Sequence, residues 1–416
     1  MRAPGIVGEP VMDDVVVTGV GVVSAAGSQF SDLVRVLGNG EGAIRPIDTP
    51  FPVTCGGAVP GPLPETPEFL DDRKAWLAFA AVDEALQDAG VVVDSLAIPS
   101  QKRAVFLGTG LSSVTPDELA DDLYPHLKEG RFQRDGLAKS LAAEGSTPWR
   151  HLPDRVTGRV AELFGAQGSV ATSFSACAAS AQAIAEGIWA LRRGEADMAI
   201  VGGHDSMLHP MGLLSFVVLG AVASTVCRPF DRNRDGFVLG EGAAIFVLER
   251  RKEAQLRGAK VRARLLGAGT SADGWNVTAP HPDGIGAERA MRRALKDARL
   301  DVGQVGYVNA HGTGTPVGDV AEAKAIRRVL GDRVPVSSIK GALGHTIAAA
   351  GGVELAACIA ALEGGWLPGT MGLSEPDPAC AVRLLKEGVF EGPVEHMISN
   401  SFGFGGQNCA LVVGRA

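Results

Sequence analysis

A run of small and apolar residues from Ser175 to Leu191, with a lone cysteine near its start, constrains the fold of this chain most strongly. Two polar residues and a glycine interrupt the run, which is too short to cross a membrane. It predicts a helix that is buried on most of its sides. The preceding segment, 169–174, has the composition of a β-strand. Cys177 is therefore predicted to lie at a turn from strand to helix.

That position allows two interpretations of Cys177. The first amides of a helix lack internal partners and the helix dipole makes that end positive. A cysteine there can have its pKa lowered from about 8.5 to between about 3.5 and 7.5, which makes it a nucleophile. Alternatively, Cys177 is a small packing residue, because free cysteines are among the most buried residue types. Its position alone favours neither interpretation.

Composition excludes several classes of function. The chain has 416 residues and a net charge of −8 with no basic block, which argues against nucleic-acid binding. Its six cysteines are scattered without a CxxC pair, which argues against the usual zinc spacings and fits a reducing compartment. The N-terminal residues lack the apolar core of a signal peptide. We expect a cytoplasmic protein with no membrane contact, no metal and no nucleotide.

Strands and helices are predicted to alternate along the chain, as in α/β folds. The segment 112–154 is polar and without period, and predicts an excursion over the surface. Strands are expected at 14–24, 103–110, 198–203 and 241–249, and a helix at 71–90.

The second half of the sequence resembles the first. The segment 82–89 is echoed by 291–298, and each is followed by a predicted strand that ends in a glycine loop. An alanine-rich helix then follows Cys177 in one half and His345 in the other. Chance could produce so short an echo. If it is real, the chain is a duplicated α/β unit with halves 14–258 and 259–416, which share one core because no linker separates them.

Two histidines, His311 and His345, lie where predicted strands give way to glycine turns. Singly, each would be an ordinary core or loop residue. Open α/β sheets place their ligand sites at such strand ends, so we expect both histidines to converge on Cys177. One histidine is enough to activate a cysteine that catalyses hydrolysis, as in cysteine proteases. Two suit a reaction in which a carboxylate is lost and imidazole N–H groups hold the resulting enolate oxygen.

These residues belong to motifs through which nearly the whole chain resembles the elongating β-ketoacyl-acyl-carrier-protein synthases of the thiolase-like superfamily. The motifs occur in the family's order: VTGVG at 17–21, SACA at 175–178, RPFD at 228–231, DGF at 235–237, NAHGTGT at 309–315, Lys340 with GHT at 344–346, and NSFGFGG at 400–406. The resemblance implies a duplicated thiolase-like fold, layered α-β-α-β-α with two mixed sheets around buried helices. It places the nucleophile in the N-terminal half and the two histidines in the C-terminal half.

The resemblance also implies an activity, the decarboxylative Claisen condensation of an acyl group with malonyl-acyl carrier protein in fatty-acid or polyketide or polyene biosynthesis. Cys177 would carry the acyl group, and the amides of Cys177 and Phe404 would form the oxyanion hole. His311 and His345 would promote decarboxylation. Lys340 and Glu354, each more often a solvated residue when taken alone, would form the buried ion pair that a buried lysine needs.

The remaining site residues follow from the same resemblance. Those expected to bind substrate or pantetheine are Thr313, Thr315, Phe402, Phe404 as the gate and Leu111 at the far end of the acyl pocket. Those expected to contact the carrier protein are Arg73 and Lys74. No resident cofactor is expected, because phosphopantetheine arrives on the carrier protein. Cys409, near the C-terminus, is interpreted as strand packing.

The chain departs from the family pattern on the carrier-protein side. Ala221 stands where the fatty-acid enzymes usually carry an arginine, and Phe216, Val217 and Val218 are expected to be exposed to a different partner. This favours specialised metabolism. The protein is expected to be a homodimer, or a heterodimer active only with a cysteine-less chain-length-factor-like subunit. An acyltransferase that performs no condensation is the other alternative, and the presence of Cys177 argues against a non-catalytic subunit.

Overall fold

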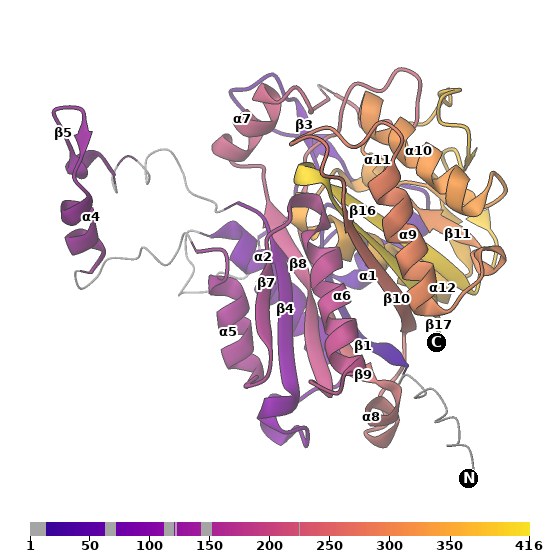
Figure 1. Cartoon of the computed structure of the whole chain (residues 1–416), viewed down its shortest axis with the longest axis horizontal. Helices are drawn as coiled ribbons and strands as arrows, with labels where there is room; N and C mark the ends of the chain where they lie inside the picture. Colours follow the sequence, from indigo (N-terminus) through magenta and orange to yellow (C-terminus); the bar gives the residue numbers. More distant parts are fainter. Residues whose placement is uncertain (1–13, 63–71, 112–119, 121–122, 143–151, 224) are drawn as a thin grey trace, which may run out of the picture.

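The computed structural model describes residues 14–62, 72–111, 120, 123–142, 152–223 and 225–416. Its main feature is an eleven-stranded mixed sheet with strand order β14-β12-β11-β16-β17-β10-β1-β9-β8-β4-β7 (Figure 1). The first half contributes β1 (Val15–Val23), β4 (Arg103–Thr109), β7 (Val170–Ser173), β8 (Met198–Ser206) and β9 (Glu241–Arg250). The second half contributes β10 (Ala263–Ala272), β11 (Tyr307–Asn309), β12 (Pro335–Ser337), β14 (Arg383–Leu384), β16 (His396–Gly403) and β17 (Gln407–Arg415).

The strand order confirms the predicted duplication. In the first half the order is β7-β4-β8-β9-β1, and in the second half it is β12-β11-β16-β17-β10. Each half therefore places its third, second, fourth, fifth and first strands in the same sequence, with β14 added at one edge. The two sheets expected are joined into one hydrogen-bonded ladder, because β1 and β10 pair from Val15 with Leu265 to Val17 with Ala263. The boundary predicted after residue 258 falls between β9 and β10.

The helices of the echoed segments occupy equivalent places. Helix α2 (Arg73–Asp88) packs on β1, and α9 (Ile285–Ala298) packs on β10. Glycines let each strand approach its helix closely. A side chain at Gly21 would come within 1.9 Å of the Ala81 carbonyl oxygen, and one at Gly269 within 2.3 Å of the Ala290 carbonyl oxygen. The echo in the sequence is thus a repeated strand–helix contact.

Two apolar helices form the centre of the molecule, α6 (Ala179–Arg192) and α12 (Ala350–Gly364), and they pack against each other. In the part of the chain that the structure describes, the segment Ile347–Gly364 alone is long and apolar enough to cross a membrane, but 89% of it is buried inside the protein. It is a core helix. Around this centre lie the remaining helices of the body: α1 (Phe30–Gly38), α5 (Arg155–Phe164), α7 (Pro210–Val218), α8 (Arg251–Leu256), α10 (Pro316–Leu330) and the short, buried α11 (Lys340–Leu343).

An arm projects from the body, on the side of the view where β7 and α5 lie (Figure 1). Its described residues form a hairpin and the helix α4 (Arg134–Leu141), and they include exposed Tyr124 and Phe132. This agrees with the predicted surface excursion over 112–154, some of whose residues lie outside the described ones. The small two-stranded sheets are β5 (Leu127–Lys128) with β6 (Arg131–Phe132), β2 (Arg45–Pro46) with β3 (Cys55–Gly56), and β13 (Trp366–Pro368) with β15 (Val389–Glu391).

Candidate active site

Cys177 lies at the predicted turn from strand to helix. Strand β7 ends at Ser173, a short 3₁₀ turn η6 (Ala176–Ala178) follows, and α6 begins at Ala179. Ala176 adopts a φ of 48°, a left-handed conformation that is strained for a residue with a side chain. This sharp turn directs the buried thiol of Cys177 toward the C-terminal half of the chain.

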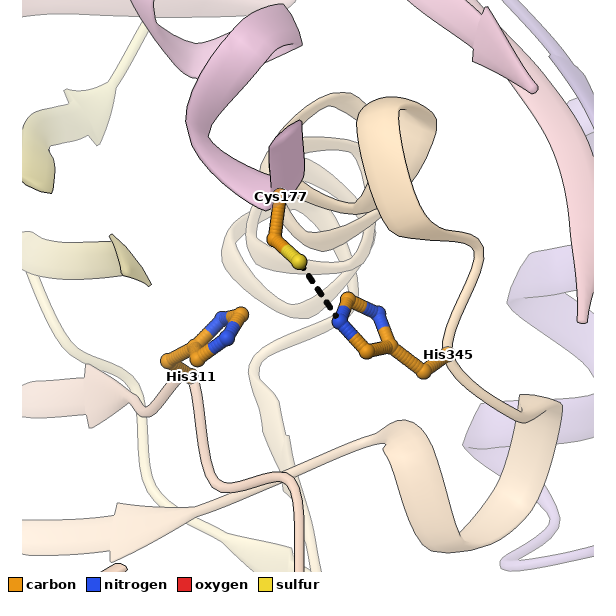
Figure 2. Close-up of side chains that lie close together, drawn as sticks. All are labelled: Cys177, His311 and His345. Atoms are coloured by element: carbon orange, nitrogen blue, oxygen red, sulfur yellow. Dashed lines mark hydrogen bonds between the residues drawn. The ribbon is translucent and has the colours of Figure 1, made fainter. Parts of the chain in front are cut away.

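Both predicted histidines converge on the thiol, as Figure 2 shows. His345 Nε2 lies 3.1 Å from Cys177 Sγ. The ring of His311, which follows β11, lies 5.3 Å from the ring of His345, centroid to centroid, and nearly perpendicular to it. One sulfur and two ring nitrogens, one from each residue, lie within 4.8 Å of one another. Three side chains that are far apart in the sequence therefore share one small volume.

Hydrogen bonds fix which nitrogen of each ring carries the proton. The Ile347 amide donates to His345 Nδ1 at 3.2 Å, and Lys340 Nζ lies 3.3 Å from His311 Nδ1. An amide and an ammonium group can only donate, so both Nδ1 atoms are acceptors and both protons are on Nε2. The Nε2–H groups face the centre of the cluster. Although such a cluster has the composition of a metal site, these nitrogens are set to donate hydrogen bonds to an oxygen.

Burial sets the charge state of the three groups. Burial, and then the positive charge of Lys340, hold the pKa of both His311 and His345 well below the usual range, so both are neutral near pH 7. Burial raises the pKa of the Cys177 thiol to about 12, while Lys340 and the Phe404 amide oppose that shift. Of the two interpretations that the position left open, a lowered pKa is not the one that this environment favours, because loss of hydration at this buried position is the largest effect on the thiol.

The raised pKa gives a testable pH dependence. Only the thiolate of Cys177 reacts with iodoacetamide, and its fraction grows about tenfold for each pH unit below the pKa. We expect the second-order rate constant of alkylation to rise with that slope from about pH 6 to pH 9, without a plateau. A plateau that begins below about pH 8 would show instead that Cys177 rests as a thiolate.

A buried ion pair supports the site, as expected. Lys340 and Glu354 are both buried and bond directly to each other. Lys340 Nζ also donates to the His311 carbonyl oxygen at 2.5 Å, which ties the ion pair to the histidine loop. Burial raises the pKa of Glu354 to about 7, and the charge of Lys340 opposes this shift.

Two carboxylates that sequence reasoning missed hold the same loop. Glu322 on α10 accepts hydrogen bonds from the amides of His311 and Gly312, both at 2.8 Å. Asp319, one turn earlier, accepts a hydrogen bond from the Gly314 amide at 3.1 Å. Both side chains are buried. The signal for them is their spacing of three residues, just after the glycine and threonine loop that carries His311.

A pocket opens onto the three groups and is lined by most of the expected substrate-binding residues: Thr313, Thr315, Phe402 and Phe404. Its cavity of about 80 Å³ has room for only a few water molecules. Phe404 separates it from an apolar cluster and packs 6.3 Å from the ring of Phe216. Gly405 and Gly406, with φ of 78° and 71°, follow Phe404 and permit it to move. A cavity of this size does not hold a long acyl chain, so some of its lining must move when one binds.

The two amides of the expected oxyanion hole, those of Cys177 and Phe404, both lie near the reactive groups. The Phe404 amide approaches the Cys177 thiol closely enough to lower its pKa. A Cβ atom at Gly403 would lie 3.1 Å from the Cys177 amide nitrogen. The absence of a side chain at Gly403 thus keeps open the space in front of the Cys177 amide.

Gly403→Ala should close that space. Gly403 has an ordinary φ of −106°, but the new Cβ atom would lie 2.9 Å from the Ser175 carbonyl oxygen, so the turn before Cys177 must shift slightly. We expect the rate of acyl transfer to Cys177 to fall about 10²-fold, because an oxyanion-hole donor contributes that much or more. Intact-protein mass spectrometry over time measures this rate. Transfer at the wild-type rate would show that the Cys177 amide does not stabilise the oxyanion.

Two expected contacts, Leu111 and Lys74, are not where the sequence suggested, whereas Arg73 keeps 39% of its side chain exposed and its predicted carrier contact stays a prediction. Leu111 is 56% exposed and does not line the pocket. Lys74 is only 4% exposed and donates to the Leu111 carbonyl oxygen at 2.9 Å, so it faces the interior and not a carrier protein. Arg73 forms two hydrogen bonds with the buried carboxylate of Glu241, at 2.7 and 2.6 Å. The position of Arg73 and Lys74 on the amphipathic helix α2 does not reveal these partners.

The apolar segment near Ala221 is only partly exposed. Phe216 was expected at the surface, but it is buried between Phe237 and Phe404. Val218 is 77% exposed, as expected, and Val217 is half-buried. Cys409 is buried in β17 and pairs with Ser401 of β16, which agrees with its interpretation as strand packing.

Comparisons with known proteins show the family to which this chain belongs. Residues 12–254 match the model of the beta-ketoacyl synthase N-terminal domain, and residues 262–374 match that of the C-terminal domain. The chain is 33% identical to 3-oxoacyl-[acyl-carrier-protein] synthase 2 of Staphylococcus aureus (strain COL), over 96% of this chain and 97% of the relative.

Solved structures agree as well. A chain of the ishigamide ketosynthase/chain length factor is 30% identical with a TM-score of 0.86, over 98% of this chain and 100% of that one. A chain from a type II polyketide synthase acyl-carrier protein in complex with its ketosynthase is 26% identical, also with a TM-score of 0.86, over 97% and 100%. Since the family models match more than half of its residues, this chain belongs to the beta-ketoacyl synthase family.

Proposed function

We propose that this chain is a β-ketoacyl-acyl-carrier-protein synthase that condenses an acyl group on Cys177 with malonyl-acyl carrier protein. The observation that carries the proposal is the convergence of a thiol and two neutral imidazoles, whose ligand atoms lie within 4.8 Å of one another, in the lining of one pocket. A nucleophile and two hydrogen-bond donors are what the two half-reactions need.

In the first half-reaction, Cys177 Sγ attacks the acyl thioester of the carrier protein. His345 Nε2–H, 3.1 Å from the sulfur, stabilises the thiolate as it forms. The amides of Cys177 and Phe404 hold the oxyanion of the tetrahedral intermediate. The C–S bond to pantetheine then breaks, the pantetheine thiol leaves with the proton, and the acyl group remains as a thioester on Cys177.

In the second half-reaction, malonyl-carrier protein binds and its carboxylate leaves as carbon dioxide. The electron pair of the broken C–C bond forms an enolate, whose oxygen accepts hydrogen bonds from His311 and His345. The enolate carbon attacks the Cys177 thioester, and the thiolate is expelled and takes a proton from solvent. Neutral imidazoles suit this step, because their N–H groups strengthen their bonds as negative charge develops on the oxygen.

The pocket provides a place for each part of the substrate. Thr313 and Thr315, whose hydroxyls lie 3.0 Å apart, hydrogen-bond the pantetheine arm along the pocket wall. Phe404 moves aside to admit the acyl chain to the apolar cluster that includes Phe216 and Phe237. No resident cofactor is needed, since the arm arrives on the carrier protein. Leu111 is exposed in the single chain, so it lines the acyl pocket only after a partner subunit binds or the loop rearranges.

The partners are an acyl carrier protein and a second subunit of the same fold, either another copy or a chain-length-factor-like chain. Strand β7 is the free edge of the sheet, and Val170 on it and Phe174 beyond it are exposed. The arm, with exposed Tyr124 and Phe132, projects on the same side (Figure 1). An unpaired apolar edge strand of this kind favours pairing with another chain. The cytoplasmic location stays a prediction.

Product analysis tests this proposal. The purified chain is incubated with acetyl, hexanoyl or dodecanoyl thioesters of an acyl carrier protein and with malonyl-carrier protein, and chain alkylated with iodoacetamide is the control. We expect carbon dioxide and a β-ketoacyl product two carbons longer in equal amounts from the chain with a free thiol, and no β-ketoacyl product from the alkylated chain. Acyl transfer to an alcohol or amine without carbon dioxide would support the acyltransferase instead. If product forms only when a chain-length-factor-like subunit is added, the heterodimer is the active form.

A further inference from the structure

The turn that carries Cys177 has a counterpart in the second half. Helix α12 begins after a 3₁₀ turn η8 (Ile347–Ala349), just as α6 begins after η6. Ile347 has a φ of 47°, and Ala176 has one of 48°. Ala348 therefore occupies the position of Cys177. The contacts are also reciprocal, because β8 packs against η8 and β16 packs against η6.

The ends of the two strands correspond residue by residue. Ser401 of β16 faces Gly351 on α12, and Gly203 of β8 faces Ser180 at the equivalent place on α6. Two residues further along each strand are Gly403 and Asp205. The missing side chain of Gly403 points at the Cys177 amide, and the side chain of Asp205 points at the Ala348 amide.

Gly403 leaves an open space in front of the Cys177 amide, and the Asp205 carboxylate fills the equivalent space in front of the Ala348 amide. Its Oδ2 accepts a hydrogen bond from the Ala348 amide at 3.0 Å, and its Oδ1 accepts one from the Ser206 amide at 2.9 Å. Ala348 corresponds to Cys177, and Ser206 corresponds to Phe404. The two amides that hold the carboxylate are thus the counterparts of the two amides of the proposed oxyanion hole.

We infer that the fold contains a second oxyanion hole, permanently occupied by the carboxylate of Asp205, and that this makes Asp205 a positioning residue for His345. The inference rests on the proposed function, since His345 is a donor in that reaction. Asp205 touches no substrate; it acts through the turn that carries the histidine.

The path from Asp205 to His345 is short. The Ala348 amide that Asp205 holds adjoins the Ile347 amide, which donates to His345 Nδ1 and so places the proton on Nε2. Ile347 is in a strained left-handed conformation, so hydrogen bonds from outside the turn are needed to hold that conformation. In it the Ile347 amide points at His345 and the Ala348 amide points at Asp205. The charge-assisted hydrogen bond that the Ala348 amide donates to the Asp205 carboxylate is suited to that task, and the one from the Ser206 amide of β8 holds the carboxylate in place.

The surroundings are built for this carboxylate. Asp205 is fully buried, and a Cβ atom at Gly110 would lie 2.1 Å from its Oδ2, so only glycine fits beside it. Burial raises the pKa of Asp205 to about 6, and the positive charge of Lys74 opposes this shift. Lys74, expected to meet the carrier protein, thus helps to keep a buried carboxylate charged.

Asp205→Gly tests the inference, because it makes the second hole like the first. We expect kcat for condensation to fall about 10²-fold while KM for the acyl-carrier protein stays the same, since binding does not involve this turn. Sodium formate should restore part of kcat by placing a small carboxylate in the hole, whereas sodium chloride at equal concentration should not. The matched control is Ser180→Ala, which removes the hydroxyl oxygen that accepts a hydrogen bond from the Gly352 amide of the same helix α12. It leaves the turn intact and should keep wild-type kcat.

The inference is overturned if folded Asp205→Gly keeps wild-type kcat, or if its loss of activity does not respond to formate. Should that variant fail to fold, Asp205→Asn takes its place, since it keeps the side-chain volume but has only one oxygen to accept a hydrogen bond from the two amides. Wild-type kcat in that variant would equally overturn the inference. Condensation by the wild-type protein in the same assay shows that the proposed function stands, so the two failures are distinguishable.

Discussion

Cys177→Ala should abolish acyl-enzyme formation and lower the rate of condensation at least about 10⁴-fold, the scale of loss when a catalytic nucleophile is removed. No other cysteine sulfur lies in the pocket among the residues that the structure describes. The histidines remain, but decarboxylation alone makes no carbon–carbon bond without a thioester to attack. Intact-protein mass spectrometry and product analysis measure the two losses.

The control for this variant is Cys409→Ala, which alters a buried cysteine on β17 that does not line the pocket. We expect wild-type acylation and condensation, with a loss of about 1 kcal/mol in the free energy of unfolding, the usual cost of a substitution. Loss of condensation in Cys409→Ala with its fold intact would contradict the interpretation of Cys409 as strand packing.

Lys340→Met should be the most damaging change outside the three reactive groups. It leaves the buried carboxylate of Glu354 without its partner, which typically costs about 3–5 kcal/mol of stability. It also removes the donor to His311 Nδ1, so the proton of that ring is no longer held on Nε2. We expect a lower Tm and a fall of about 10³-fold in condensation, measured on protein at a temperature where the variant is folded.

The double variant Lys340→Met/Glu354→Leu separates the two effects. Replacing both charges of a buried ion pair with apolar groups is often neutral for stability. We expect Tm to return toward the wild-type value while condensation stays low, since the hydrogen bond to His311 is still missing. Recovery of activity together with Tm would mean that the ion pair serves stability alone.

Local sequence patterns were sufficient to predict the framework of the site. The composition of 169–191 predicts the strand, the turn and the buried helix around Cys177, since each depends on neighbouring residues. The echo between 82–89 and 291–298 predicts the duplication, which the strand order confirms. His311 and His345 were predicted to converge on Cys177 because each follows a strand and lies in a glycine turn, and strand ends in α/β sheets meet at one edge.

Features that depend on distant partners were not predictable in this way. The raised pKa of Cys177 follows from burial by both halves of the chain, which the position at a helix terminus does not disclose. Lys74 is buried, donates to the Leu111 carbonyl oxygen and acts on the Asp205 carboxylate, and no local pattern distinguishes it from a surface lysine. Asp205 was missed because its role depends on the Ala348 amide, 143 positions away.

The measurement that tests the central claim most directly follows one acyl group through both half-reactions. The chain is acylated from hexanoyl-carrier protein, freed of excess donor, and mixed with malonyl-carrier protein, and the acyl-enzyme mass and the carbon dioxide are recorded over time. Our account predicts that the adduct on Cys177 disappears as carbon dioxide and a β-ketoacyl product appear, one molecule of each for every adduct lost. Loss of the adduct without carbon dioxide, or condensation without any adduct, would contradict it.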